Sequence, residues 1–332
     1  MDNLTLSMVI PVYNVEKYIR STMDSIVIMR TDLFNFEVIV VDDGTPDNSI
    51  KIVEEYKDRI DNLLIVHQEN QGLSVARNTG LRYAKGDLVW FIDSDDTITP
   101  NAIDVISEVI KTEADIYAFD MYKVHEGETV KVIESMITRY KNFKYYGNAH
   151  LGTSLYGKIH YGAAPKNIFK RQFLEQNNLR FYPGIFFEDI EFLIRAQICA
   201  KKIVPVHTPI YCYLLRGNGS IMTSLRVKHL KDLMTVVENF KRFYTSEAKS
   251  NKERAIMGDA IFRMAYTALG WNENKIVGYN NFMRSHSQAL RYDAVTFGLK
   301  SLYYFKIEKV VKILLCAIAP LSLISFNEKK GR

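Results

Sequence analysis

The sequence predicts an α/β protein: a mostly parallel sheet with helices on both faces, followed by a helical C-terminal region. In the first third of the chain, short β-branched runs alternate with amphipathic helical patterns, which is typical of a parallel sheet covered by helices. One run, 36–41, is apolar almost throughout, as expected of a strand buried on both faces. Beyond residue 225, the strand-like runs end and helical periodicity takes over. We therefore expect two regions, 1–225 and 226–332.

The elements of the first region are expected to alternate between strand and helix. The predicted strands span 6–12, 36–41, 63–66, 88–92, 115–122 and 210–215. Asn14 is the expected N-cap of the first helix, and Thr45-Pro46 is expected to open the second, because the missing N–H of proline costs little at the first helical position. Later helices are expected over 73–84, after Pro100 and over 188–200. Between 123 and 182 the periodicity is weak, so we expect an edge hairpin, loops and short helices.

Composition narrows the class of protein. With 332 residues, 47% of them hydrophobic and 24% charged, the chain is long and apolar enough to bury a full core. The formal net charge of +5 suits phosphate-bearing ligands or an anionic membrane surface, and gives no reason to expect a nucleic-acid partner. The three cysteines, Cys199, Cys212 and Cys316, match neither a disulfide framework nor a zinc site. Since no export signal is visible at the N-terminus, we expect a cytoplasmic protein.

The clearest chemical signal is the acidic segment Asp93-Ser94-Asp95-Asp96, directly after the predicted strand 88–92. Residues i and i+2 of an extended backbone point the same way, so Asp93 and Asp95 can converge on one ligand. Carboxylate oxygens suit hard cations such as Mg²⁺ or Mn²⁺, which bridge protein carboxylates and a substrate diphosphate. On the residues alone, a loop in which Asp96 or Thr97 caps the next helix is an equally good interpretation.

Two further segments lie after predicted strands, at the carboxyl edge where open α/β sheets bind ligands. Asp43, in the segment 40–44, can accept hydrogen bonds from a base or a ribose, although Asp and Gly are also common in ordinary turns. Tyr13, in the segment 11–14, can stack on a base. Each of these two signals is weak by itself.

Charged side chains also mark two predicted helix starts. In the segment 72–80, small residues allow another backbone to approach closely, and Arg77 is either a fixed positive charge for a diphosphate or a solvated surface charge. In the segment 186–189, Glu188 and Asp189 occupy the first turn of a predicted helix. Acidic residues there interact favourably with the helix dipole, so capping competes with the interpretation that one of them is a general base.

Together, these five segments resemble family 2 glycosyltransferases with the Rossmann-like GT-A fold, particularly bacterial enzymes that build capsule, O-antigen or exopolysaccharide. The similarity runs from about Leu6 to Ser220, with the segments in the same order and at appropriate spacing. The resemblance implies that 1–225 is the catalytic domain. A QxxRW-type signature of processive synthases is missing after Glu188–Asp189, which implies transfer of a single sugar.

The resemblance also implies roles for individual residues. The nucleotide-sugar donor would be bound by Pro11, Tyr13, Asp43, Arg77, Asp93 and Ser94. The metal, Mg²⁺ or Mn²⁺, would bind Asp95 and Asp93. The catalytic base would be Asp189, with Glu188 beside it. The stretch 216–220 resembles a segment that closes over the donor.

The implied reaction inverts the anomeric centre of the sugar. Asp189 would take the proton from an acceptor hydroxyl that attacks the anomeric carbon, and the metal would neutralise the charge growing on the leaving diphosphate. We expect a UDP-sugar as donor. The expected acceptor is a hydroxyl of a glycan or lipid-linked glycan in bacterial surface polysaccharide synthesis.

The C-terminal region is predicted to be helical over 227–246, 253–270, 274–291 and 300–319. Its segment 313–326 is mostly apolar but shorter than the ~20 residues that a membrane span needs. Basic residues flank this segment, and basic flanks around an apolar strip favour an anionic lipid surface. We therefore expect 308–326 to make a peripheral contact with the inner face of the cytoplasmic membrane; a helix packed on the protein's own core is the alternative.

Two other functions fit parts of the pattern. A nucleotidyl- or phosphosugar-handling enzyme on a similar fold would also carry acids at strand ends. Such an enzyme would be expected to have a glycine-rich, basic loop after the first strand, which the segment 11–14 does not supply. An inactive membrane-bound scaffold would keep the fold, but all the acidic residues of the pattern are present. We therefore favour the transferase.

Overall fold

The computed structural model describes residues 4–29, 35–126, 147–157, 162–216, 225–271, 274–301, 312, 313 and 316. The chain divides into two compact units, the first formed by 1–184 and 195–217, the second by 185–194 and 218–332. The second unit begins close to the boundary predicted near 225, but it also includes the segment 185–194. The assignment of 1–225 as the catalytic domain stays a prediction.

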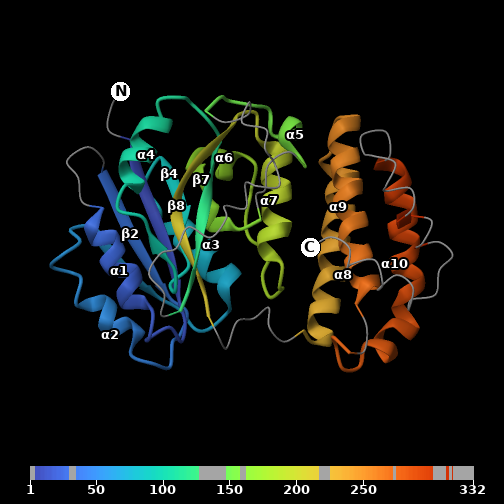
Figure 1. Cartoon of the computed structure of the whole chain (residues 1–332), viewed down its shortest axis with the longest axis horizontal. Helices are drawn as coiled ribbons and strands as arrows, with labels where there is room; N and C mark the ends of the chain where they lie inside the picture. Colours follow the sequence, from blue (N-terminus) through green and yellow to red (C-terminus); the bar gives the residue numbers. More distant parts are fainter. Residues whose placement is uncertain are drawn as a thin grey trace. The chain divides into compact units, whose positions relative to one another are not determined.

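In the described part of the first unit, one eight-stranded sheet runs in the order β3-β2-β1-β4-β7-β6-β8-β5 (Figure 1). The strands are β1 (Thr5–Val12), β2 (Asn35–Asp42), β3 (Leu63–His67), β4 (Leu88–Phe91), β5 (Thr97–Ile98), β6 (Ile116–His125), β7 (Asn167–Lys170) and β8 (Ile203–Leu215). The block β3-β2-β1-β4 is parallel throughout, and β6 and β8 are also parallel. β7 pairs antiparallel with both β4 and β6, and β5 pairs antiparallel with β8. The predicted strands at 6–12, 36–41, 63–66 and 88–92 thus form the parallel block.

Helices cover both faces of this sheet, as predicted. On one face, Met8 and Ile10 of β1 share a core with side chains from α1 (Ile19–Ile28), α2 (Ser49–Glu54) and α4 (Ala102–Val109). On the other face, α3 (Leu73–Tyr83) lies so close to β1 that a Cβ at Gly80 would overlap the side chain of Val9. The remaining helices that begin in or extend into this unit are α5 (Gly152–Leu155), the 3-10 helix η3 (Ala164–Lys166), α6 (Arg171–Gln176) and α7 (Glu188–Cys199).

Two predicted helix starts are wrong. Asn14 is not an N-cap but adopts a positive φ of 54°, and α1 begins only at Ile19. Likewise α2 begins at Ser49 and not directly after Thr45-Pro46. The reason is that side chains bind backbone N–H groups in the turns before both helices. The Asn14 N–H donates to Thr45 Oγ1 at 2.8 Å, and the Ser49 N–H donates to the Asp47 carboxylate at 3.0 Å. These short polar side chains take up backbone donors locally, which delays both helices.

The weakly periodic segment 123–182 contributes an internal strand that was not predicted. β7 lies between β4 and β6, and the indole N–H of Trp90 donates to the Pro165 carbonyl just before it, at 2.7 Å. The short helices expected there are present as α5 and α6. Most of the segment that would hold the expected hairpin, 127–146, lies outside the described residues. A strand of only four residues is too short to produce a readable alternation.

In the described part of the second unit, three long helices share a core of their own. They are α8 (Val227–Ser246), α9 (Asn251–Gly270) and α10 (Tyr279–Ser301). α8 and α9 match the predicted 227–246 and 253–270 closely, whereas α10 extends beyond the predicted 291. The expected helix 300–319 and the segment 308–326 lie almost entirely outside the described residues. Within the described ranges, no helix has the length and apolarity required to cross a membrane.

The close contact between α3 and β1 predicts that Gly80→Ala destabilises the first unit. The added methyl group would overlap Val9 Cγ1, and β-branched valine has little freedom to move aside. Overpacking of this kind costs about 1–3 kcal/mol of unfolding free energy, measurable by urea denaturation. Lys51→Ala, at an exposed position of α2, is the matched control and should stay within about 0.5 kcal/mol of the parent. An unchanged unfolding free energy in Gly80→Ala would contradict the close packing of α3 against β1.

Candidate functional site

The acidic segments predicted from the sequence meet at one edge of the sheet. Asp43 follows β2, Tyr13 follows β1, and Asp93 lies two residues beyond the end of β4. Because β2, β1 and β4 are parallel neighbours, their carboxyl ends lie side by side. The edge therefore gathers residues that are up to 80 positions apart in the chain, at the place where open α/β sheets bind ligands.

Asp93 is paired with Arg77 of α3. The guanidinium Nη2 of Arg77 donates to Asp93 Oδ1 at 2.7 Å, and the Arg77 side chain is only 1% exposed. The guanidinium also lies over the ring of Phe181, 5.0 Å from its centroid. Arg77 is therefore not a solvated surface charge. The geometry makes it a buried partner that fixes the orientation of the Asp93 carboxylate.

Asp95 is paired with a second arginine, Arg216, which directly follows β8. The Arg216 guanidinium contacts Asp95 Oδ2 and lies over the ring of Tyr18, 4.3 Å from its centroid. Burial raises the pKa of Asp95, the neighbouring Asp93 raises it further, and Arg216 lowers it. Arg216 is the first residue of the predicted donor-closing stretch 216–220, and the other four lie outside the described residues.

Asp96 has a structural role that sequence reasoning did not find. Its carboxylate accepts the Tyr211 hydroxyl at 2.6 Å and the Leu214 N–H at 2.7 Å, both from β8. The Tyr211 oxygen in turn accepts the Asp93 N–H at 3.1 Å. Burial and the neighbouring carboxylates raise the pKa of Asp96 well above its usual value. Asp96 thus ties the acidic turn to β8, and the capping interpretation of Asp96 is wrong.

Ser94 is largely buried in the same turn. Its carbonyl accepts the Thr22 hydroxyl of α1 at 3.0 Å, and the same hydroxyl lies 2.7 Å from the Asp96 carbonyl. Three elements, α1, β4 and β8, therefore hold the turn that presents Asp93 and Asp95. The donor-binding role predicted for Ser94 stays a prediction.

The Asp43 carboxylate organises the loop that leads into α3. It accepts the Gln68 side-chain amide at 2.7 Å, the Gln71 N–H at 2.9 Å and the Gly72 N–H at 2.8 Å. Gly72 has a φ of 86°, which favours glycine immediately before the helix. Asp43 is therefore a hydrogen-bonded anchor as well as a predicted ligand of the base. By contrast, Tyr13 is 48% exposed, so its ring is accessible to a partner.

The chemistry of the acidic turn fits a divalent cation that is shared with a substrate. Among the described residues, no group of three or more His, Cys, Asp or Glu side chains is assembled as a metal site. Asp93 uses Oδ1 and Asp95 uses Oδ2 for their arginines, which leaves the opposite oxygen of each carboxylate available as a hard ligand. Mg²⁺ is commonly held by one or two carboxylates together with substrate phosphates and water. Two carboxylates are thus an appropriate donor set for a cation that arrives with a diphosphate.

Glu188 and Asp189 lie in the first turn of α7, as predicted. They belong to the segment 185–194 of the second unit, whereas the acidic edge belongs to the first. Phe187, directly before them, has a positive φ of 66°. The base role of Asp189 stays a prediction.

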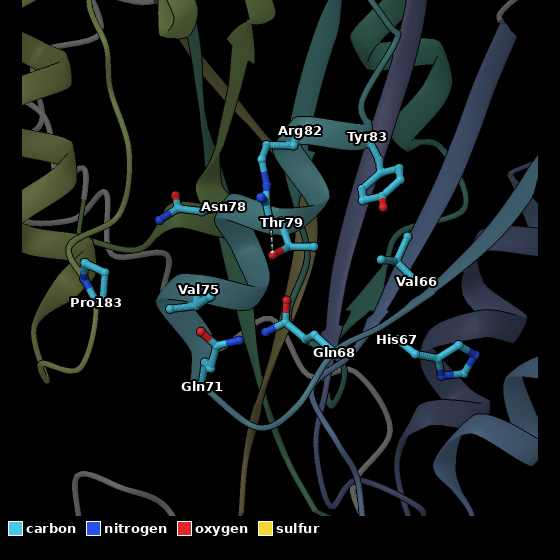
Figure 2. Close-up of a pocket in the computed structure, with 10 residues that line it drawn as sticks. All are labelled: Val66, His67, Gln68, Gln71, Val75, Asn78, Thr79, Arg82, Tyr83 and Pro183. Carbon is cyan, nitrogen blue, oxygen red and sulfur yellow. Dashed lines mark hydrogen bonds between the residues drawn. The ribbon is translucent and has the colours of Figure 1, made fainter.

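A cavity of about 720 Å³ lies beside α3 (Figure 2). Gln71, Asn78 and Arg82 line it from the α3 segment, and Pro183 lies across from Asn78 (Figure 2). Gln68 and Gln71 are also the residues whose amides hold Asp43. None of the predicted site residues lines this cavity, so it adjoins the Asp43 loop and not the Asp93–Asp95 turn.

Comparison with known proteins identifies the family. A sequence model described as Glycosyl transferase family 2 matches residues 7–176. The chain belongs to this family. This glycosyltransferase is 32% identical to EpsH of Bacillus subtilis (strain 168) over 258 residues, which cover 76% of this chain and 73% of EpsH. Some relatives are much longer: the match covers 31% of GlyA of Streptococcus pneumoniae serotype 4 and 38% of TarS of Staphylococcus aureus.

Solved structures show the same fold. TarS of Staphylococcus aureus, residues 1–349 in complex with UDP-GlcNAc, matches with a TM-score of 0.66 and 20% identity, covering 99% of this chain and 93% of TarS. The mannosyltransferase PcManGT of Pyrobaculum calidifontis, in complex with GDP-Man and Mn²⁺, matches with a TM-score of 0.55 and 14% identity, covering 97% and 83%. The predicted α/β class with the GT-A fold and additional C-terminal helices is confirmed. Neither the phosphosugar-handling alternative nor the inactive scaffold gains support from these matches.

The buried ion pair predicts that Arg77→Met destabilises the first unit. Methionine keeps much of the apolar stem but leaves Asp93 without its guanidinium, and loss of one partner of a buried pair costs about 3–5 kcal/mol. Because Asp93 is 27% exposed, water compensates part of this loss and we expect about 2 kcal/mol in urea denaturation. Arg82→Met, at an exposed position of the same helix, serves as the control. If the two substitutions lowered the unfolding free energy equally, the Arg77–Asp93 pair would have no special role in stability.

Proposed function

We propose that this glycosyltransferase is an inverting, divalent-metal-dependent enzyme that moves one sugar from a nucleoside-diphosphate donor to an acceptor hydroxyl. The observation that carries the proposal is the single sheet edge at which Asp43 follows β2 and Asp93 and Asp95 follow β4, the two strands that flank β1 in the parallel block. Carboxylates at this edge offer ligands for a cation and acceptors for ribose or base donors. The buried arginine beside them holds one of these carboxylates in a fixed orientation.

The donor is proposed to be a UDP-sugar. The exposed ring of Tyr13 offers a stacking surface for a base at the end of β1, and Pro11 and Asp43 lie at the same edge. The TarS structure with a similar fold carries UDP-GlcNAc, which supports a uridine nucleotide in this position. Ser94 and Asp93 would contact the ribose or sugar side of the donor.

The cofactor is proposed to be Mg²⁺ or Mn²⁺ on Asp95 and Asp93. When bound, the cation would supply positive charge for the leaving diphosphate. Asp93 and Asp95 would orient their available oxygens toward it, with Arg77 and Arg216 holding the opposite oxygens. The Mn²⁺ in the PcManGT complex supports a divalent ion in a protein of this fold.

Asp189 is proposed to be the general base, with Glu188 beside it. Asp189 would accept the proton of the acceptor hydroxyl while that oxygen attacks the anomeric carbon, and the nucleoside diphosphate would leave from the opposite side. This single displacement inverts the anomeric centre and needs no covalent enzyme intermediate. The position of both acids in the first turn of α7 supports the assignment, because the helix dipole there favours negatively charged side chains.

The acceptor is proposed to be a glycan or lipid-linked glycan of a bacterial surface polysaccharide. TarS, which is also a 29% identical sequence relative, is named as a poly(ribitol-phosphate) β-N-acetylglucosaminyltransferase. A peripheral position of the segment 308–326 on the inner face of the cytoplasmic membrane would bring the site close to such an acceptor. No nucleic-acid partner is proposed.

The base assignment predicts that Asp189→Asn loses sugar transfer and keeps donor binding. The amide cannot accept the proton, and general-base catalysis contributes roughly 10²–10⁴-fold in rate. Transfer is measured with radiolabelled donor, and donor affinity by calorimetry with the unreactive nucleoside diphosphate. Near-normal turnover in Asp189→Asn would remove the residue from the base role.

The metal assignment predicts that Asp95→Ala weakens binding of the nucleoside diphosphate in the presence of Mg²⁺ or Mn²⁺. Without the carboxylate, the cation loses one of two protein ligands and no longer links the diphosphate to the chain. Calorimetric titration of UDP with and without EDTA measures this linkage. The parent should lose affinity in EDTA, and Asp95→Ala should be insensitive to it. Full activity of the parent in EDTA would contradict a metal requirement.

A further inference from the structure

The residue directly before Glu188 has an unusual backbone conformation. Phe187 adopts a φ of 66°, in the left-handed region that bulky side chains rarely occupy. Its carbonyl accepts the Glu191 N–H at 3.1 Å, so Phe187 closes the first turn of α7. The direction in which Glu188 and Asp189 leave this turn therefore depends on how Phe186 and Phe187 are held. A strained backbone of this kind persists only where the surrounding structure fixes it.

The N-terminal part of α8 fixes Phe186. The Phe186 N–H donates to Asp232 Oδ2 at 2.9 Å, and the same oxygen accepts Lys228 Nζ at 2.6 Å. The Phe186 ring stacks on His229, with 4.2 Å between centroids and 12° between planes. Lys228 Nζ also lies 4.8 Å from the centre of this ring. One turn of α8 thus holds both the backbone and the ring of Phe186.

Burial and further contacts fix the position of the His229 ring. It is 1% exposed, its Nδ1 accepts the Arg226 N–H at 3.0 Å at the start of α8, and its ring meets Phe187 edge-on at 6.2 Å and 67°. Phe187 also lies 6.4 Å from the ring of Trp271, within the core of the second unit. All these residues belong to the second unit, which explains why the segment 185–194 clusters with α8–α10.

We propose that Asp232 and His229 of α8 are positioning residues for the catalytic carboxylate of Asp189. This inference rests on the proposed function, because it assigns the orientation of the base to a contact made by the helical unit. Asp232 and His229 contact Phe186, three residues before Asp189, and His229 also contacts Phe187, two residues before it. The helical unit would then set the rate of proton removal.

A merely structural contact would affect stability and leave the chemistry of the correctly folded enzyme unchanged. A positioning contact predicts a lower kcat with an unchanged donor KM, because a misplacement of about 1 Å costs roughly 100-fold in rate. It also predicts non-additivity: once Asp189 is replaced, the orientation of its backbone should no longer matter.

The test is a double-mutant cycle in the full-length chain. Asp232→Ala removes the oxygen that holds the Phe186 N–H, and we expect kcat for transfer to fall roughly 10- to 100-fold with little change in donor KM. Asp232→Asn keeps an acceptor oxygen at this position and should recover most of the lost kcat. In the Asp189→Asn background, adding Asp232→Ala should cause no further loss. His229→Ala should lower kcat as Asp232→Ala does, whereas His229→Phe, which keeps a stacking ring, should keep most of the parent's kcat.

Asp293→Ala is the matched control. Asp293 of α10 is also a buried carboxylate paired with a lysine, Lys241, in the same unit, but among the described residues it has no hydrogen bond or ion pair with the segment 185–189. Its removal should lower thermal stability as much as Asp232→Ala does and leave kcat unchanged. Normal kcat in Asp232→Ala, or losses that multiply in the double mutant, would overturn the positioning role alone. Near-normal turnover in Asp189→Asn by itself would overturn both this role and the base assignment.

Discussion

The arrangement of the acidic edge depends on carboxylates that hold helix α3 at two points. Asp43, from the end of β2, accepts two backbone N–H groups at the entrance of the helix. Asp93, from beyond β4, accepts the Arg77 guanidinium one turn further on. Between these points, Gly80 and Val9 bring α3 against β1. The helix therefore cannot shift without breaking charged contacts at the ligand-binding edge, and the same acids that are expected to bind donor also define the shape of the site.

Electrostatic balance explains why three aspartates can lie within one buried turn. Burial raises the pKa of Asp95 and of Asp96, and the neighbouring carboxylates raise both pKa values further. Two arginines, from α3 and from the end of β8, offset part of this repulsion, and Tyr211 donates to the most buried carboxylate. A divalent cation at this turn would add positive charge where the arginines leave carboxylate oxygens available. The arginines and the proposed cation would therefore contact different oxygens of the same carboxylates, so that both can be present together.

The helical unit also includes residues that we propose for catalysis. The segment that contains Glu188 and Asp189 belongs to this unit, and α8 holds Phe186, which directly precedes the strained Phe187. The acids Glu188 and Asp189 belong to the second unit, whereas Asp43, Asp93 and Asp95 belong to the first.

Periodicity and residue chemistry, read from the sequence alone, determined the parallel block of strands, helices α8 and α9, and the membership of Asp43, Asp93 and Asp95 in one edge. These features follow from local rules: buried parallel strands are continuously apolar, and their carboxyl ends share an edge. The roles of Asp96, Tyr211 and Arg216 came only from the tertiary structure, because Tyr211 and Asp96 are 115 residues apart and nothing local relates them. The late starts of α1 and α2, the internal strand β7 and the anchoring of Phe186 by α8 were decided in the same way. The start of α1 and the anchoring of Phe186 depend on backbone N–H groups that donate to side chains far away in the sequence, and β7 depends on pairing with β4 and β6. Such contacts exist only after the chain has folded.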